Sequence, residues 1–396
     1  MFEHIAPYAG DPILGLMEKF SQDPRTDKVN LGVGIYYDEA GKIPVLSSVR
    51  RAEERVFAAH SATSYLPIEG DRNYRSQVAT LLFGANVESL TESLAVVQTV
   101  GGSGALKVGA DFLKQNFSSS SVYVSDPTWD NHIGIFEGAG FKVGRYRYYD
   151  PQTKGLDFQG MLEDLSKLKQ HDIALLHPCC HNPTGVDPDQ HQWSQILDVV
   201  QERGLIAFVD IAYQGFAESI TEDAFVIREL ARRKMNFLVS SSFSKTFSLY
   251  GERCGALTVH CAEPIQTANV LGQLKFTVRR NYSSPPTHGM RLIATVLSDT
   301  SLRKMWTEEL DSMRMRIVTM REKLYTALSL AVPGRSFAHV VKQRGMFAYT
   351  GLTAAEVAAL QSNFGVYAVS TGRVCIAGLN DSNVDYVAKA VASVVK

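Results

Sequence analysis

The sequence predicts an α/β fold, with a large domain built on a largely parallel sheet and a second, smaller domain. At 396 residues the chain exceeds the size at which one hydrophobic core usually stops growing. Through its middle, strand-like apolar runs alternate with segments of helical period. Repeated units of this kind place parallel strands side by side, with helices over both faces of the sheet.

The alternation runs from residue 94 to residue 245. The apolar runs that predict the strands lie within 94–100, 121–127, 172–185, 205–215 and 236–245. The segments of helical period between them lie within 103–117, 131–140, 193–204 and 225–234. Polar residues follow the strands directly. Because the C-terminal ends of parallel strands share one edge of a sheet, we expect these polar clusters to converge there.

The last third of the chain has a different pattern. It predicts one long helix, two strand-like runs and a closing helix, within 302–328, 346–352, 367–379 and 384–395. We expect this part to join the N-terminal segment in the smaller domain, made of residues 1–44 with 313–396. The large domain is then 45–312.

The charge balance argues against several classes of partner. The chain carries 40 Lys and Arg against 41 Asp and Glu, so its net charge attracts neither nucleic acid nor a membrane. The N-terminus lacks the basic region and apolar run of a signal peptide, and no window approaches the roughly 18 apolar residues that span a bilayer. We therefore expect a cytoplasmic protein.

The five cysteines predict neither a disulfide framework nor a zinc knuckle, because their number is odd and they lack C-x-x-C spacing. We expect reduced, buried thiols and no metal. Cys179 and Cys180 are adjacent, but a disulfide between neighbours is strained, so packing is the favoured role.

Lys245 is the strongest candidate for covalent chemistry. A single lysine is most often a solvated surface charge. This one follows an apolar run in SSSFSKTFSLYGERCG, with serines before it and Arg253 eight positions after it. A lysine that forms a Schiff base must lose its proton near neutral pH, and hydroxyls and a nearby cation favour that and also bind phosphate. Pyridoxal phosphate requires all of these features.

The same cofactor needs a carboxylate against its pyridine nitrogen, because a protonated ring is a stronger electron sink. Asp210 follows the apolar run LIAFV and is the natural candidate. Tyr213, three residues on, and Asn182 in HNPTG could hydrogen-bond the phenolic oxygen of the ring. Taken singly, such residues are commonly a helix cap, a core tyrosine and a turn. Their shared position at predicted strand ends favours the functional interpretation.

The segment GGSGALKVG is a glycine-rich turn that leads into a helix. Helix N-termini of this kind bind phosphate through free backbone N–H groups and the helix dipole. The segment lacks the G-x-G-x-x-G spacing of a dinucleotide site and lies well inside the chain, so a single phosphate fits better than a nicotinamide cofactor.

In order and spacing, segments along the whole chain resemble the fold-type I, subgroup I aminotransferases, which include the aspartate and aromatic amino acid aminotransferases. The matching segments are DPILGLMEKF, NLGVGIYYDEAG, SDPTWDNH, HPCCHNPTG, DIAYQGF, SSFSKTFSLYGERCG, NYSSPP and STGRV. The resemblance implies a seven-stranded, mostly parallel sheet in a large cofactor-binding domain and a smaller α/β domain. It also implies a homodimer with shared active sites and ping-pong transamination through pyridoxamine phosphate.

The resemblance also implies roles for single residues. Lys245 would hold the cofactor and then shuttle the proton as general acid and base. Asp210 would pair with the pyridinium, supported by His132, and Trp129 would stack on the ring. The expected catalytic residues are Lys245, Tyr65, Tyr213, Asp210 and Trp129. The expected cofactor-binding residues are these five together with Asn182, Gly102, Ser103, His132, Ser242 and Arg253. Tyr65 would reach the phosphate from the partner subunit.

Two arginines are expected to bind the substrate's carboxylates, because a guanidinium grips a carboxylate through two parallel hydrogen bonds. Arg373 in STGRV matches the arginine for the α-carboxylate, and Arg279 in VRRNYSSPP matches the partner-subunit arginine for the distal one. Arg280 is the alternative, but the spacing before NYS favours Arg279. The expected substrate-binding set is Arg373, Arg279, Gly34, Trp129 and Asn182.

Residues expected to line the pocket resemble the aromatic branch of this family more than the strict aspartate branch. They are Tyr37, Ile43, Ser103 and Ser284, while Ser64 departs from the aromatic pattern. Tyr37 and Ile43 add apolar surface, which favours an aromatic substrate side chain. We therefore expect phenylalanine and tyrosine as well as aspartate and glutamate as amino donors, with 2-oxoglutarate or a related 2-oxo acid as acceptor.

Three alternatives share parts of this pattern. A strict aspartate aminotransferase would carry the same cofactor residues. Another pyridoxal-phosphate enzyme, such as a β-decarboxylase or lyase, would also carry them, but two carboxylate-binding arginines favour transamination. A non-enzymatic effector-sensing domain would be expected beside a basic recognition helix, which this sequence lacks.

Overall fold

The computed structural model describes residues 1–7, 10 and 12–395, and the chain divides into two compact units. One unit is Pro44–Met315, and the other joins Met1–Ile43 with Arg316–Lys396. The role of the larger unit as the cofactor-binding domain, expected over 45–312, remains a prediction.

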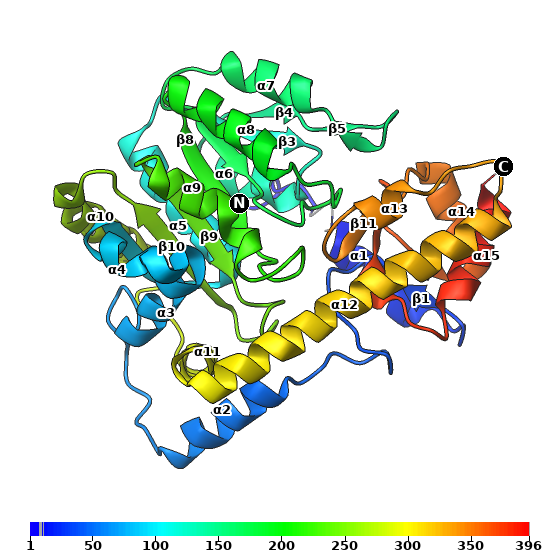
Figure 1. The fold of residues 1–396 in the computed structure, drawn as a ribbon, viewed down its shortest axis with the longest axis horizontal. Coiled ribbons are helices and arrows are strands. Elements are labelled where there is room, and N and C mark those ends of the chain that lie inside the picture. Colours follow the sequence, from blue (N-terminus) through cyan, green and yellow to red (C-terminus); the bar gives the residue numbers. More distant parts are fainter. Residues whose placement is uncertain (8–9, 11, 396) are drawn as a thin grey trace. The chain divides into compact units, whose positions relative to one another are not determined.

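A seven-stranded sheet forms the centre of the larger unit (Figure 1). Its strands, in order across the sheet, are β2 (Leu94–Val100), β10 (Cys254–His260), β9 (Phe237–Ser242), β8 (Ile206–Ile211), β7 (Ile173–Leu176), β3 (Val122–Asp126) and β4 (Val143–Arg147). Strand β10 is antiparallel to both neighbours, whereas the remaining pairs are parallel. The predicted fold class is confirmed, although β4 and β10 are not among the strands predicted from the sequence.

Helices lie on both sides of this sheet (Figure 1). Those of the larger unit are α2 (Ser47–Ala58), α3 (Arg72–Phe83), α4 (Val87–Leu90), α5 (Gly101–Asn116), α6 (Asp130–Gly138), α7 (Phe158–Ser166), α8 (Gln190–Glu202), α9 (Phe225–Arg232), α10 (Thr267–Asn281) and α11 (His288–Ser298). Apolar residues of α5, α6 and α10 pack with those of the strands into one core, which includes Leu106, Phe136, Phe208 and Leu274. A short hairpin, β5 (Tyr149–Asp150) with β6 (Gly155–Leu156), completes the unit.

The smaller unit contains two short two-stranded sheets and several helices. Strand β1 (Val29–Asn30) pairs in parallel with β12 (Val366–Tyr367), so the N-terminal segment and the C-terminal part share a sheet. Strand β11 (Phe347–Tyr349) pairs antiparallel with β13 (Arg373–Cys375). The helices are α1 (Pro12–Gln22), α13 (His339–Lys342), α14 (Ala354–Phe364) and α15 (Val384–Val394). The long helix α12 (Thr300–Ala331) begins in the larger unit and ends in this one.

The long helix and the closing helix occur where the sequence predicts them, as α12 and α15. The run 367–379 contains only the short strand β13 and the end of β12, so regular strand structure is briefer there than expected. In the part of the chain that the structure describes, no helix combines the length and apolar character needed to cross a lipid bilayer.

Candidate active site

Lys245 lies in the turn after β9, three residues past Ser242 at the end of the strand. Burial lowers the pKa of its amine from 10.5 to about 8, while the charges of Asp210 and Arg253 act in opposite directions. The amine lies 5.3 Å from the centre of the Tyr213 ring. An amine with this pKa is neutral in a substantial fraction of molecules near neutral pH, which suits a nucleophile or a general base.

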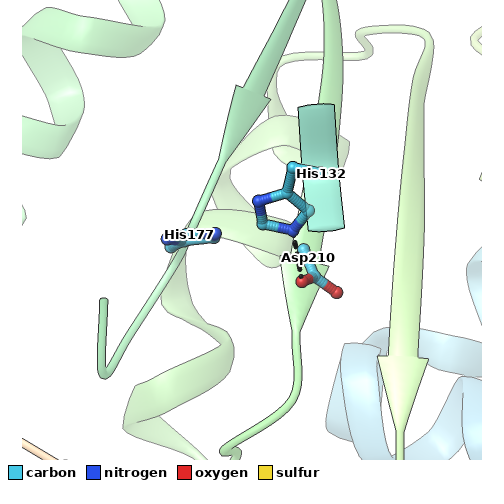
Figure 2. Close-up of side chains that lie close together, drawn as sticks. All are labelled: His132, His177 and Asp210. Carbon is cyan, nitrogen blue, oxygen red and sulfur yellow. Dashed lines mark hydrogen bonds and ion pairs between the residues drawn. The ribbon is translucent and has the colours of Figure 1, made fainter. Parts of the chain in front are cut away.

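Asp210 lies near the end of β8 and receives a hydrogen bond from His132 of α6. The distance from Nε2 of His132 to the carboxylate is 3.0 Å, and the imidazole is fully buried (Figure 2). Burial alone would raise the pKa of Asp210, but the hydrogen bond and the charge of His132 outweigh it and hold the pKa below its usual value. The carboxylate is therefore ionised and held in place, ready to pair with a cation.

The ring of His132 is fixed on its other sides as well. Its Nδ1 lies 2.9 Å from Oγ1 of Thr128, and the Trp129 indole meets the ring edge to face at 5.1 Å. Trp129 is partly buried and stands immediately before α6. Of the sequence-predicted residues of SDPTWDNH, His132 thus contacts Asp210 directly, and Trp129 contacts His132.

His177 and His181 extend this group, although neither is among the residues predicted from the sequence. The ring of His177 lies 5.0 Å from that of His132 (Figure 2). It lies 4.6 Å from the ring of His181. His181 stacks on Tyr148 at 3.9 Å. Burial lowers the pKa of His177 to about 3 and holds the pKa of His181 well below its usual value, so both rings are neutral.

Two histidines and a carboxylate can also ligate a transition metal. One ligand atom from each of His132, His177 and Asp210 lies within 4.8 Å of the others. Since the Nε2 of His132 and the carboxylate are already hydrogen-bonded to each other, a metal would have to displace that bond. The geometry favours an orienting role for the histidine.

A second polar group lies where β2 leads into α5 and β9 leads to the lysine. Gly101 has a φ of +68°, and a Cβ there would come within 2.7 Å of the Arg253 guanidinium. Arg253 also lies 3.4 Å from the Ser244 hydroxyl, which in turn lies 3.4 Å from that of Ser242. A helix N-terminus, a guanidinium and two hydroxyls form a set suited to an anion such as a phosphate.

These features fit pyridoxal phosphate. The buried amine of Lys245 is influenced by the charges of a carboxylate and a guanidinium, and the missing side chain of Gly101 leaves room for the Arg253 guanidinium. Gly102 and Ser103 lie in the first turn of α5. Tyr213 is buried, and Asn182, partly buried, follows β7. All belong to the larger unit.

Two further predicted residues of the larger unit, Tyr65 and Arg279, have surroundings of their own. The Tyr65 side chain is 94% exposed. Arg279 donates to Ser283, whereas Arg280 donates to Gln115 at 3.0 Å and its guanidinium covers the Phe276 ring at 4.2 Å. Both arginines are exposed residues at the end of α10.

Arg373 and Gly34 belong to the smaller unit. Arg373 is buried in β13, donates to the carbonyl of Gly32 at 2.7 Å and lies over the Phe347 ring at 4.4 Å. A Cβ on Gly34 would come within 2.7 Å of the same ring, so a larger residue there would push Phe347 against Arg373.

The chain is similar along its length to proteins of known activity. The family described as Aminotransferase class I and II matches residues 26–391. An aromatic-amino-acid aminotransferase of Escherichia coli (strain K12) is 54% identical over 396 residues, with 100% of both chains covered. An aspartate aminotransferase of Pseudomonas aeruginosa is 49% identical, with 100% of this chain and 99% of the relative covered. The crystal structure of an aromatic-amino-acid aminotransferase from Burkholderia pseudomallei, covalently bound to pyridoxal phosphate, has a TM-score of 0.98 and 49% identity, with 100% of both chains covered.

Proposed function

Since the chain belongs to the class I and II aminotransferase family, we propose that it transfers an amino group between an aromatic or acidic L-amino acid and 2-oxoglutarate or a related 2-oxo acid, with pyridoxal phosphate as cofactor. The observation that carries this proposal is the buried Lys245 amine, whose pKa of about 8 reflects burial between Asp210 and Arg253. The bound cofactor in the Burkholderia relative supports it.

The chain's own residues would hold the cofactor at two ends. Asp210 would pair with the ring nitrogen, while Gly102, Ser103, Ser242 and Arg253 would bind the phosphate. Tyr213 and Asn182 would hold the phenolic oxygen, and Trp129 would cover one face of the ring. When bound, pyridoxal phosphate supplies an aldehyde that condenses with amines and a protonated ring that accepts an electron pair.

Lys245 would move the proton. Its neutral amine would take the proton from the substrate's Cα. Burial supports this role, because it keeps the amine's pKa close to the working pH, where general-base catalysis is most efficient. Asp210 would remain ionised throughout, because His132 donates to it from a fully buried position.

Substrate carboxylates would be bound by the two arginines. Arg373 would take the α-carboxylate, and its fixed position over Phe347 supports a preformed site. Arg279 would receive a distal carboxylate. Arg280 is held against Gln115 and Phe276, which supports the choice of Arg279.

The greater identity to the aromatic relative than to the aspartate relative, 54% against 49%, supports an aromatic preference with dual specificity. A strict aspartate aminotransferase is the second candidate. We further propose a homodimer, supported by the 94% exposure of Tyr65, which suits a residue that completes a partner's site, and a cytoplasmic location.

The decisive experiment mixes the purified yellow protein with aspartate or with phenylalanine in the absence of any oxo acid. Conversion of the cofactor's absorbance band by both amino acids is expected, and the relative rates identify the branch. Conversion by aspartate alone would favour the strict enzyme. Lys245→Ala should abolish conversion, and an unchanged band with both amino acids in the wild type would overturn the proposed function.

A further inference from the structure

Cys179, Cys180 and Asp223 form a buried cluster that the proposed reaction does not use. One ligand atom from each lies within 4.8 Å of the others. The cysteines are 6% and 3% exposed, and Asp223 is 4% exposed. Neither sulfur is part of a disulfide, and the two residues are adjacent in the chain. A pair of reduced sulfurs thus lies in the segment that follows β7.

The carboxylate of Asp223 has a structural task of its own. It accepts hydrogen bonds from the backbone N–H groups of Gly215, Ala217 and Glu218 at 2.8, 3.0 and 2.9 Å. A longer bond comes from Ser219 at 3.4 Å. Because both carboxylate oxygens already accept bonds, Asp223 is a poor candidate ligand. The two thiols are the nucleophilic groups of the cluster.

The Cys179 thiol is neutral, which decides the kind of ligand that the pair suits. The hydrogen bond with Cys180, together with burial and the nearby carboxylates, raises the pKa of the Cys179 thiol well above its usual value. Binding of a cation such as Zn²⁺ requires thiolates and releases protons into this buried site. A disulfide between neighbouring cysteines is strained and requires an oxidant. A ligand whose own oxygen accepts the thiol protons needs neither preformed thiolates nor an oxidant.

We propose that Cys179 and Cys180 form a chelating dithiol site for trivalent arsenic compounds. With phenylarsine oxide, two As–S bonds form, the As–O bond breaks, and the oxygen leaves as water with both thiol protons. Arsenic remains in the +3 state, so no oxidant or reductant is consumed. The adjacency of the two sulfurs in the chain and in space favours a single bridging adduct over two separate ones.

The two cysteines adjoin residues of the candidate active site. The Cys180 sulfur is 3.9 Å from the carbonyl of Tyr213, and Asn182 is two residues further along the chain. The backbone N–H groups of Cys180 and His181 are anchored on Asp187 at 2.7 and 2.8 Å. An arsenic bridge would therefore press on Tyr213 and Asn182. This second effect, weaker cofactor binding, rests on the proposed function, whereas the adduct itself does not.

The experiment treats the native holoenzyme with phenylarsine oxide and measures its intact mass. We expect one phenylarsenic group per chain with loss of two hydrogens, located by peptide mapping to the segment that contains Cys179 and Cys180. Removal by a small dithiol, but not by a monothiol, should restore the original mass. The labelling rate should fall at least tenfold in Cys180→Ala and in Cys179→Ala, and it should be unchanged in Cys261→Ala, which removes another buried thiol.

An adduct that forms equally fast in Cys180→Ala, or one that maps to other cysteines, would overturn the proposal. So would a native protein that stays unlabelled while the denatured chain reacts. If the alanine variants fail to fold, Cys180→Ser and the peptide map of the wild type decide the question. The cofactor's absorbance, recorded in parallel, separates the two claims: an adduct without loss of absorbance supports the dithiol site and contradicts only its link to the cofactor.

Discussion

The buried amine of Lys245 should make the stability of the cofactor-free protein rise with pH in the alkaline range. We consider Lys245→Met, which keeps the length of the side chain and removes its charge. In the folded protein burial lowers the pKa of Lys245 from 10.5 to about 8. At about 1.4 kcal/mol for each pH unit, the folded state loses up to about 3 kcal/mol when this lysine is charged. The side chain keeps partial solvent exposure, so the value is an upper bound.

The sign follows from proton binding. Below about pH 8 the lysine is charged in both the folded and the unfolded chain, and the full cost is present. Between about pH 8 and its usual pKa of 10.5, the unfolded chain binds more protons, so the wild type becomes more stable as the pH rises. The methionine variant has no such ionisation. It should be the more stable protein near neutral pH, and its advantage should shrink by about 2 to 3 kcal/mol as the pH approaches about 10.

Urea denaturation of the cofactor-free wild type and variant, repeated across this pH range, measures the difference. Lys304→Met is the matched control, because the Lys304 side chain is 78% exposed and its replacement should give a difference that does not vary with pH. A stability difference between wild type and Lys245→Met that stays constant with pH would refute the burial argument, and with it the reason for regarding Lys245 as a base near neutral pH.

Three further predictions concern single residues. Arg279→Leu should lower kcat/KM for aspartate by roughly 100-fold, because about 3 kcal/mol of binding to the distal carboxylate is lost. The kcat/KM for phenylalanine should fall by less than roughly tenfold, and Arg280→Leu is the control. Equal losses for both substrates would mean that another arginine binds the distal carboxylate. His132→Phe removes the hydrogen bond to Asp210 and should weaken pyridoxal phosphate binding by roughly tenfold in an absorbance titration of the cofactor-free protein; an unchanged affinity would contradict the orienting role. Asp223→Ala leaves buried backbone N–H groups without their acceptor and should lower the free energy of unfolding by about 3 kcal/mol in urea; a loss below about 1 kcal/mol would show that the turn reorganises.

The parts of the fold that the sequence predicts best are those whose local pattern and tertiary role agree. The run 94–100 is mostly apolar and becomes β2, and the helical period of 302–328 lies within α12. Strand β10 escapes prediction because its first residues, Cys254, Gly255 and Ala256, are small and carry little strand propensity. The structure supplies the reason for the glycine, since a Cβ on Gly255 would come within 2.4 Å of the Gly101 backbone.

The candidate site likewise contains residues that can be predicted from the sequence and residues that cannot. Lys245 and Asp210 can be predicted because each follows an apolar run, and strand ends of a parallel sheet are where ligands bind. His177 stands in an equivalent position after β7, yet a single histidine near a strand is common in protein cores, so its sequence context carries little information. Its contact with His132 depends on the pairing of β7 with β3 and β8, which only the folded chain reveals.

Asp223 shows that the charge of a residue does not by itself predict whether the residue is exposed to solvent. In the sequence it stands beside Glu222 in a polar stretch, where a carboxylate is usually solvated. In the structure it is buried, and burial raises its pKa although several backbone N–H groups bond to it. A carboxylate held in this state stabilises the turn that carries Tyr213, and it lies beside the two thiols. The same residue therefore links the stability of the candidate active site to the reactivity of Cys179 and Cys180. Asp223→Ala should also speed labelling by phenylarsine oxide, because local opening of the turn would expose both thiols.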